Sequence, residues 1–188
     1  MKGQGQSAKT IGNSAFTKIE KVNSDLLAIT YGSFVVQLIK DKGNIEEVNC
    51  TLEEIGASIG SRIVDEFFAK SQIELCKNLN ETAEAIAKIG FKMFLNIDAN
   101  VTVDENKKEF NITFSDNPLS DFVELPDNYS STIWYSNILC GIIRGGLKTL
   151  NTIVKCTFIK DMLKGDPINE IKVEIKEIIK DKYDDEEN

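Results

Sequence analysis

Residues 116–150, DNPLSDFVELPDNYSSTIWYSNILCGIIRGGLKTL, join a loop to an apolar helix and decide the fold of this chain. Two prolines and several Asp and Asn residues indicate that the first half is irregular. Glycines at 141, 145 and 146 lie inside the predicted helix, where each costs about 1 kcal/mol relative to alanine. We therefore expect another segment to approach this backbone closely. The apolar residues at helical spacing are Tyr135, Ile138, Leu139, Ile142, Leu147 and Leu150.

The composition suits one globular domain and excludes several functional classes. The chain has 188 residues, of which 41% are hydrophobic, enough for a sizeable core. Its net charge is -8 and Arg62 and Arg144 are its only arginines, which argues against nucleic-acid or phosphate recognition. Because the sequence has no histidine, Ser-His-Asp triads, Cys-His dyads and imidazole metal sites are excluded.

The cysteines and the apolar runs bear on the cellular compartment. Cys50, Cys76, Cys140 and Cys156 are widely spaced and form no C-x-x-C pair, so we expect reduced thiols and no metal site. The first 24 residues lack the apolar core of a signal peptide, and no run reaches the roughly 18 apolar residues of a membrane span. We expect a cytoplasmic protein.

The N-terminal half predicts a tail and two helices. Residues 1–22 are polar and without period, which predicts a flexible tail. Ser24 and Asp25 begin the first helix, and Gly43 follows its last apolar residue. The apolar positions of this helix are Leu27, Tyr31, Phe34, Val35, Leu38 and Ile39.

A second helix is predicted from Glu46 to Lys70, with Gly56 and Gly60 placed to allow close contact with a partner helix. Its apolar stripe comprises Val48, Leu52, Ile55, Ile59, Ile63 and Phe67. Either the first helix or an identical copy of the chain must cover part of this long stripe. We therefore predict a dimer surface on these two helices.

A connector that contains Cys76 precedes a third helix, ETAEAIAKIGFKMFL, which Asn80 is expected to cap. The predicted inward face is unusually small, which indicates either very close helix packing or an unfilled channel for a long, thin ligand. That face consists of Ala83, Ile86, Ala87, Gly90 and Phe94.

The C-terminal half predicts strands. Val101 and Val103 begin a hairpin that continues through Phe110, Ile112 and Phe114. Residues 155–164 give mixed signals, and a turn at 165–167 leads to a strand with Ile171, Val173 and Ile175 on one face. Residues 181–188 form an acidic tail. The order of elements predicts an α+β domain at 23–180, with four main helices on one face of a small antiparallel sheet.

Four stretches resemble the Bet-three family of subunits of TRAPP, the transport protein particle complex. They are ITYGSFVVQL, NPLSDFVELPDN, YSNILCGIIRG and LKGD, and the resemblance runs from Leu26 to Ile179. It implies a Bet-three-like fold without catalytic activity, in a complex that tethers vesicles between the ER and the Golgi and activates a Rab GTPase. It also implies peripheral association with ER and cis-Golgi membranes.

The resemblance further implies roles for individual residues. Members of this branch carry palmitate on a cysteine between the second and third helices, a position that Cys76 occupies, and Lys77 beside it could favour the thiolate. Palmitate is the expected covalent group, and no other cofactor or metal is expected. Ile86, Ala87, Gly90 and Phe94 match the wall of the acyl channel.

The same family implies a homodimer, contacts with other TRAPP subunits, and a Rab GTPase reached through the assembled complex. The expected dimer or partner face comprises Leu27, Tyr31, Val35, Ile55 and Ile59. A contact with the GTPase is expected at Tyr183, Asp184 and Asp185, and no nucleic-acid partner is expected.

Two other classes of function remain open at this point. A small hydrophobic-ligand or lipid-binding sensor would exchange its occupant with free lipid, whereas the subunit would hold it covalently. A self-acylating enzyme that uses Cys76 as its nucleophile would lack a general base, because the sequence has no histidine.

Overall fold

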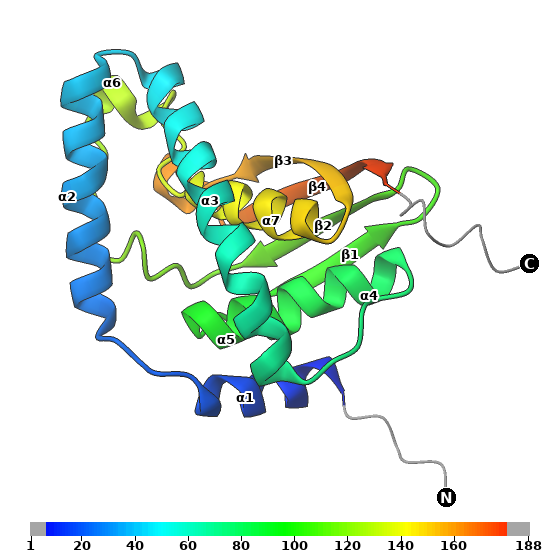
Figure 1. Ribbon diagram of the computed structural model, residues 1–188. Helices are drawn as coiled ribbons and strands as arrows, with labels where there is room; N and C mark the ends of the chain where they lie inside the picture. The colour runs from blue at the N-terminus through cyan, green and yellow to red at the C-terminus, as the bar shows by residue number, and fades with distance from the viewer. Residues whose placement is uncertain (1–6, 180–188) are drawn as a thin grey trace, which may run out of the picture.

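Alternating apolar and polar residues build a four-stranded antiparallel sheet in the computed structural model (Figure 1), which describes residues 7–179. The order across the sheet is β1-β2-β4-β3. The strands are β1 (Asn100–Asp104), β2 (Glu109–Phe114), β3 (Thr152–Lys160) and β4 (Asn169–Ile178). The region with mixed signals thus forms most of an edge strand, followed by the short 3-10 helix η2 (Met162–Lys164).

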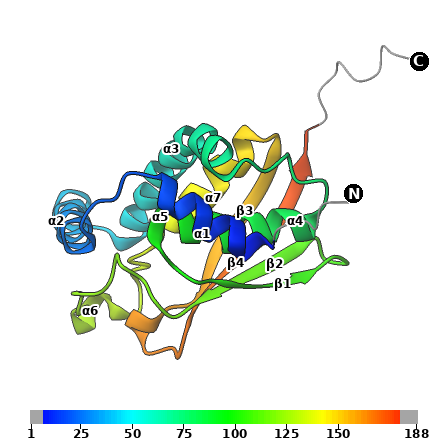
Figure 2. The same ribbon diagram turned by 90° about the horizontal axis from the view of Figure 1, so that it is seen from below.

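Helices cover one face of this sheet, as the view from below shows (Figure 2). The helical elements are α1 (Ala8–Lys18), α2 (Ser24–Lys42), α3 (Ile45–Ser71), α4 (Leu79–Glu84), the π-helical segment η1 (Ala85–Gly90), α5 (Phe91–Leu95), α6 (Asp127–Ser130) and α7 (Ile138–Thr149). Of these, α2 and α6 lie beside the sheet rather than over it (Figure 2). Phe110, Ile112 and Phe114 of β2 are buried beneath the covering helices, as are Ile171 and Val173 of β4. The predicted α+β fold is confirmed.

Glycines bring α3 and α7 into direct backbone contact. A Cβ atom at Gly56 or Gly60 would lie 2.2 or 2.1 Å from a carbonyl oxygen of α7. A Cβ atom at Gly141 or Gly145 would lie 2.1 or 2.0 Å from a carbonyl oxygen of α3. The expected close approach is confirmed, and α7 rather than a second chain covers the inner side of α3.

The predicted flexible tail over residues 1–22 is wrong for Ala8–Lys18, which form α1. Its polar sequence gave little sign of this helix, because the helix docks through small residues, Gly12 and Ala15, rather than through a large apolar stripe. Two helix starts also differ from the predictions. Asn23 rather than Ser24 caps α2, and Asn78 rather than Asn80 caps α4.

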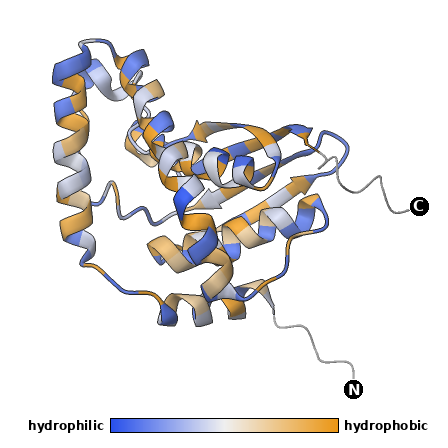
Figure 3. Cartoon of the chain, in the orientation of Figure 1, coloured by the Kyte–Doolittle hydropathy of each residue, from blue (hydrophilic) through white to orange (hydrophobic). Residues whose placement is uncertain are grey.

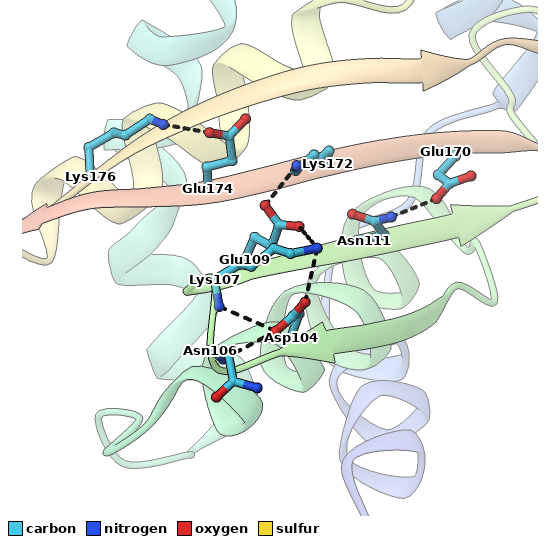
Figure 4. A network of polar contacts seen from close by, with 9 residues as sticks. All are labelled: Asp104, Asn106, Lys107, Glu109, Asn111, Glu170, Lys172, Glu174 and Lys176. Atoms are coloured by element: carbon cyan, nitrogen blue, oxygen red, sulfur yellow. Dashed lines mark hydrogen bonds and ion pairs between the residues drawn. The ribbon is translucent and has the colours of Figure 1, made fainter.

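The other face of the sheet is polar and carries a network of charged side chains (Figure 4). Glu109 of β2 accepts from Lys172 of β4 at 2.7 Å, and Asn111 donates to Glu170 at 2.7 Å. Cross-strand pairs of opposite charge favour this register. Among the helices of residues 7–179, none has the length and apolarity needed to cross a bilayer.

Candidate functional site

Cys76 lies in the connector between the end of α3 and the start of α4. At Gln72 the backbone adopts a left-handed conformation, with φ 57°, and its N–H caps the carbonyl of Phe68. The chain therefore turns sharply as it leaves α3. The Cys76 side chain is half-buried and its thiol is free.

Reciprocal hydrogen bonds fix the connector to α4 immediately after Cys76. The Asn78 side chain accepts from the Glu81 N–H at 2.9 Å, and the Glu81 carboxylate accepts from the Lys77 N–H at 2.7 Å. This exchange satisfies two backbone donors at the start of the helix. The residue that follows Cys76 is thus held by α4.

Burial raises the pKa of the Cys76 thiol above its ordinary value. A hydrogen bond with the Thr82 side chain acts in the opposite direction, and the negative charge of Glu81 raises the pKa further. The expected help from Lys77 does not prevail, because burial dominates. At neutral pH Cys76 is a protonated thiol, so this connector suits a stable modification better than rapid nucleophilic turnover.

The small-residue face after Cys76 is rotated relative to the prediction. Ala87 is fully buried, as predicted, but Ile86, Gly90 and Phe94 are half-buried. The reason is η1, whose i to i+5 hydrogen bonds shift the inward positions from the usual helical spacing. The buried residues of this region are Ala83, Ala85, Ala87, Ile89, Phe91 and Met93.

Gly90 of η1 faces the C-terminal half of α3. We call the zone between these two segments the seam. A Cβ atom at Gly90 would lie 3.9 Å from Cε2 of Phe67 in α3 and 3.8 Å from the carbonyl oxygen of Ala85. The seam therefore joins small residues of η1 to an aromatic side chain, and an acyl channel along it stays a prediction.

Two shallow recesses lie elsewhere on the described surface. One, of about 330 Å³, is lined by Ser24, by residues 95–97 and by the loop at 116–121. The other, of about 210 Å³, lies over β1 and β2. Neither is lined by Cys76 or by the predicted channel residues.

The predicted partner face does not correspond to one exposed surface. Tyr31 and Val35 are buried within the chain, with 7% and 1% exposure, and the Tyr31 hydroxyl donates to the Tyr135 carbonyl at 2.6 Å. Leu27, Ile55 and Ile59 are partly buried against the same core. The sequence pattern found the apolar side of α2 that packs inward.

A second apolar stripe on α2 was not predicted. Leu26, Ile29 and Val36 are 62%, 62% and 51% exposed and lie opposite the core-facing side. Figure 3 shows apolar residues along α2, which stands at the edge of the molecule. Their spacing of three and seven residues was visible in the sequence, and an apolar helix side of this kind indicates a partner.

The remaining candidate residues have simpler surroundings. Cys140 and Cys156 are buried, and burial raises the pKa of both thiols, whereas Cys50 is exposed. Within residues 7–179, no group of three or more Cys, Asp or Glu side chains is placed to hold a metal ion. Tyr183, Asp184 and Asp185 lie outside the described residues.

Comparison with known proteins gives consistent matches over most of the chain. Residues 27–174 match the family model described as transport protein particle (TRAPP) component. Trafficking protein particle complex subunit 3 of Dictyostelium discoideum is 54% identical over 172 residues, which cover 91% of this chain and 92% of that protein. Trafficking protein particle complex subunit BET3 of Saccharomyces cerevisiae is 41% identical, over 95% of this chain and 94% of its own length.

A solved structure matches the fold as well. The crystal structure of a trafficking protein particle complex subunit 3 from Naegleria fowleri, covalently bound to palmitic acid, has a TM-score of 0.82. Its sequence is 46% identical, and the match covers 86% of this chain and all of that one.

Proposed function

Because this chain belongs to the TRAPP component family, we propose that it is a core subunit of a vesicle-tethering complex in ER-to-Golgi transport and carries palmitate on Cys76. It assembles with other subunits, pairs with a second copy of itself, and associates peripherally with ER and cis-Golgi membranes. In the complex it acts as a scaffold for nucleotide exchange on a Rab GTPase, with little exchange activity of its own.

The observation that carries the lipid assignment is the position of Cys76. It is a free, half-buried thiol in the connector between α3 and α4, the helix that continues into η1, and a similar structure holds palmitic acid covalently. The apolar and small side chains of the seam fit a hydrocarbon chain, since Phe67, Ala87 and Gly90 present no charge to it. Cys76 would hold the acyl group, and these three residues would contact it.

The modification is a thioester exchange. The Cys76 sulfur attacks the carbonyl carbon of an acyl-coenzyme A thioester, the carbon–sulfur bond to coenzyme A breaks, and the proton of the Cys76 thiol passes to the departing thiolate. Because burial raises the pKa of Cys76, only a small fraction is thiolate at neutral pH and loading is slow. The same burial partly shields the thioester from water, so the product persists.

Partner binding is assigned to the outer stripe of α2, which we define as Leu26, Ile29 and Val36. The inner side of α2 already packs on the core through Tyr31 and Val35. A helix that is apolar on both sides is stable when a partner covers its free side. We assign that side to the second copy or to another subunit.

The lipid assignment is tested by the intact mass of the purified full chain, before and after neutral hydroxylamine, beside a Cys76→Ser variant and a matched Cys50→Ser control. We expect a fatty-acyl mass increment that hydroxylamine and Cys76→Ser both abolish and that Cys50→Ser retains. An increment that survives Cys76→Ser would overturn the site. Loss of the occupant on dilution without hydroxylamine would instead favour the exchanging lipid sensor.

A further inference from the structure

Helix α1 lies across the seam between α3 and η1 (Figure 2), in contact with η1, α5 and α3. Its closest approach is at Gly12, where a Cβ atom would lie 2.2 Å from the carbonyl oxygen of Lys88 in η1. Near its other end, the Lys18 amine donates to the carbonyl oxygen of Lys70, in the last turn of α3, at 3.2 Å. One helix thus connects both sides of the seam.

The docking of α1 is shallow. Gly12 and Ala15 are its buried residues, and the Lys18 bond to α3 is exposed. Phe16 is half-buried and lies under the Lys21 amine, 4.3 Å from its ring centroid. Because the fully buried residues of α1 are small and its larger apolar residues Ile11 and Phe16 are only half-buried, α1 can detach locally while the core stays folded.

We propose that α1 is a detachable strap that keeps the seam closed over the acyl chain on Cys76; this rests on the palmitoylation proposed above. The acyl chain enters the seam from the connector that follows Lys70. Helix α1 is bonded to that same end of α3. Docked α1 slows the access of water and nucleophiles to the thioester. Detached α1 opens the seam for loading or loss of the lipid.

Gly12→Ala separates docking from helix formation. Alanine favours a helix more than glycine does, so α1 itself is not weakened. The added Cβ atom cannot be accommodated 2.2 Å from a backbone oxygen, so α1 must move off η1. Ser14→Ala is the matched control, because Ser14 is an exposed residue of the same helix.

The readout is the rate at which acylated full chain loses its acyl group in neutral hydroxylamine, followed by intact mass. Hydroxylamine nitrogen attacks the thioester carbonyl, the acyl group leaves as a hydroxamic acid, and the Cys76 thiol is regenerated. We expect this rate to rise by about tenfold or more in Gly12→Ala, as local opening becomes the dominant state, and to stay unchanged in Ser14→Ala.

The outcomes separate the strap from the lipid site. Equal rates in Gly12→Ala and in the unaltered chain would overturn the strap and leave the lipid site intact. The absence of an acyl group from every variant would overturn the proposed lipid function itself. If Gly12→Ala does not fold, Lys18→Met removes the bond to α3, with Lys9→Met as its exposed control, and the same comparison of rates decides.

Discussion

Gly145 and Gly146 are neighbours in α7 with opposite surroundings. A Cβ atom at Gly145 would lie 2.0 Å from the Ala57 carbonyl oxygen, whereas at Gly146 the nearest atom is a Val64 methyl group at 3.6 Å. We expect Gly145→Ala to lower the free energy of unfolding by about 2–4 kcal/mol, because two packed helices must separate. Urea unfolding followed by circular dichroism measures the change.

Gly146→Ala is the internal control for this substitution. It meets only ordinary van der Waals contact, so we expect no loss of stability, and a gain of up to about 1 kcal/mol from the better helix propensity of alanine. Equal losses in the two variants would show that the α3–α7 distance is not what selects glycine at Gly145.

Two neighbours of Cys76 are expected to change its loading in opposite directions. Glu81→Gln removes a charge that raises the pKa of Cys76 and keeps an oxygen for the Lys77 N–H, so acylation by palmitoyl-coenzyme A should be faster. Thr82→Val removes a hydrogen bond that lowers this pKa, so acylation should be slower.

The pH profile checks the sign of both effects. The thiolate is the attacking species, so the rate should rise as pH increases toward the raised pKa of Cys76, by about tenfold per pH unit. At any one pH below that pKa, acylation should be fastest in Glu81→Gln, intermediate in the unaltered chain and slowest in Thr82→Val. Thr82→Ser keeps the hydroxyl group and should match the unaltered chain. The same order at all pH values, including those above the pKa, would assign the differences to structure rather than to ionisation.

At the scale of elements, the outer stripe of α2 can be tested separately from its inner side. Ile29→Glu places a charge on a side chain that is 62% exposed, so we expect a change in stability within about 0.5 kcal/mol but loss of self-association or subunit binding. Light scattering gives the oligomeric state, and co-purification with other subunits gives the assembly.

A control variant that places the same charge on another surface shows whether the loss of association is specific to α2. Thr157→Glu changes an exposed residue of β3 on the polar face of the sheet and should leave association unchanged. Association that survives Ile29→Glu, or that is lost equally in Thr157→Glu, would contradict the assignment of the outer stripe.

Most elements could be predicted from the sequence because their signals are local. Caps and apolar periods placed α2 and α3 to within a residue or two, and alternation placed β2 and β4. The glycines of α3 and α7 predicted a close contact but not that each helix is the partner of the other. That pairing depends on the whole fold, which a local pattern does not contain.

The elements that were missed owe their stability to contacts made far along the chain. Helix α1 docks through Gly12 on η1, a surface formed by residues about seventy positions later, and its other fully buried residue is the small Ala15, so its own sequence carries little apolar signal. The π-helical turn at Ala85–Gly90 rotated the small face after Cys76. A regular helical period therefore predicted the full burial of Ala83 and Ala87 correctly, whereas Ile86, Gly90 and Phe94 are only half-buried.

For the whole molecule, the proposed acyl chain is large compared with the stability of a domain. Burying a palmitoyl chain contributes on the order of 10 kcal/mol at about 0.8 kcal/mol per methylene, as an upper bound, whereas domains are stable by roughly 5–15 kcal/mol. We expect acylated chain to unfold at clearly higher urea concentration than the same preparation after hydroxylamine. Chemical denaturation of both forms measures the difference.

This comparison also decides between a structural lipid and a membrane anchor. An acyl chain held in the seam stabilises the fold and leaves vesicle binding unchanged, because its methylenes are already out of water. An acyl chain exposed at the connector would leave stability unchanged and would bind vesicles. Cys50→Ser, which keeps the acyl group, controls for the loss of a thiol and should behave as the unaltered chain does in both assays. Vesicle binding by the acylated form, without any gain in stability, would contradict a buried chain and with it the role of the seam.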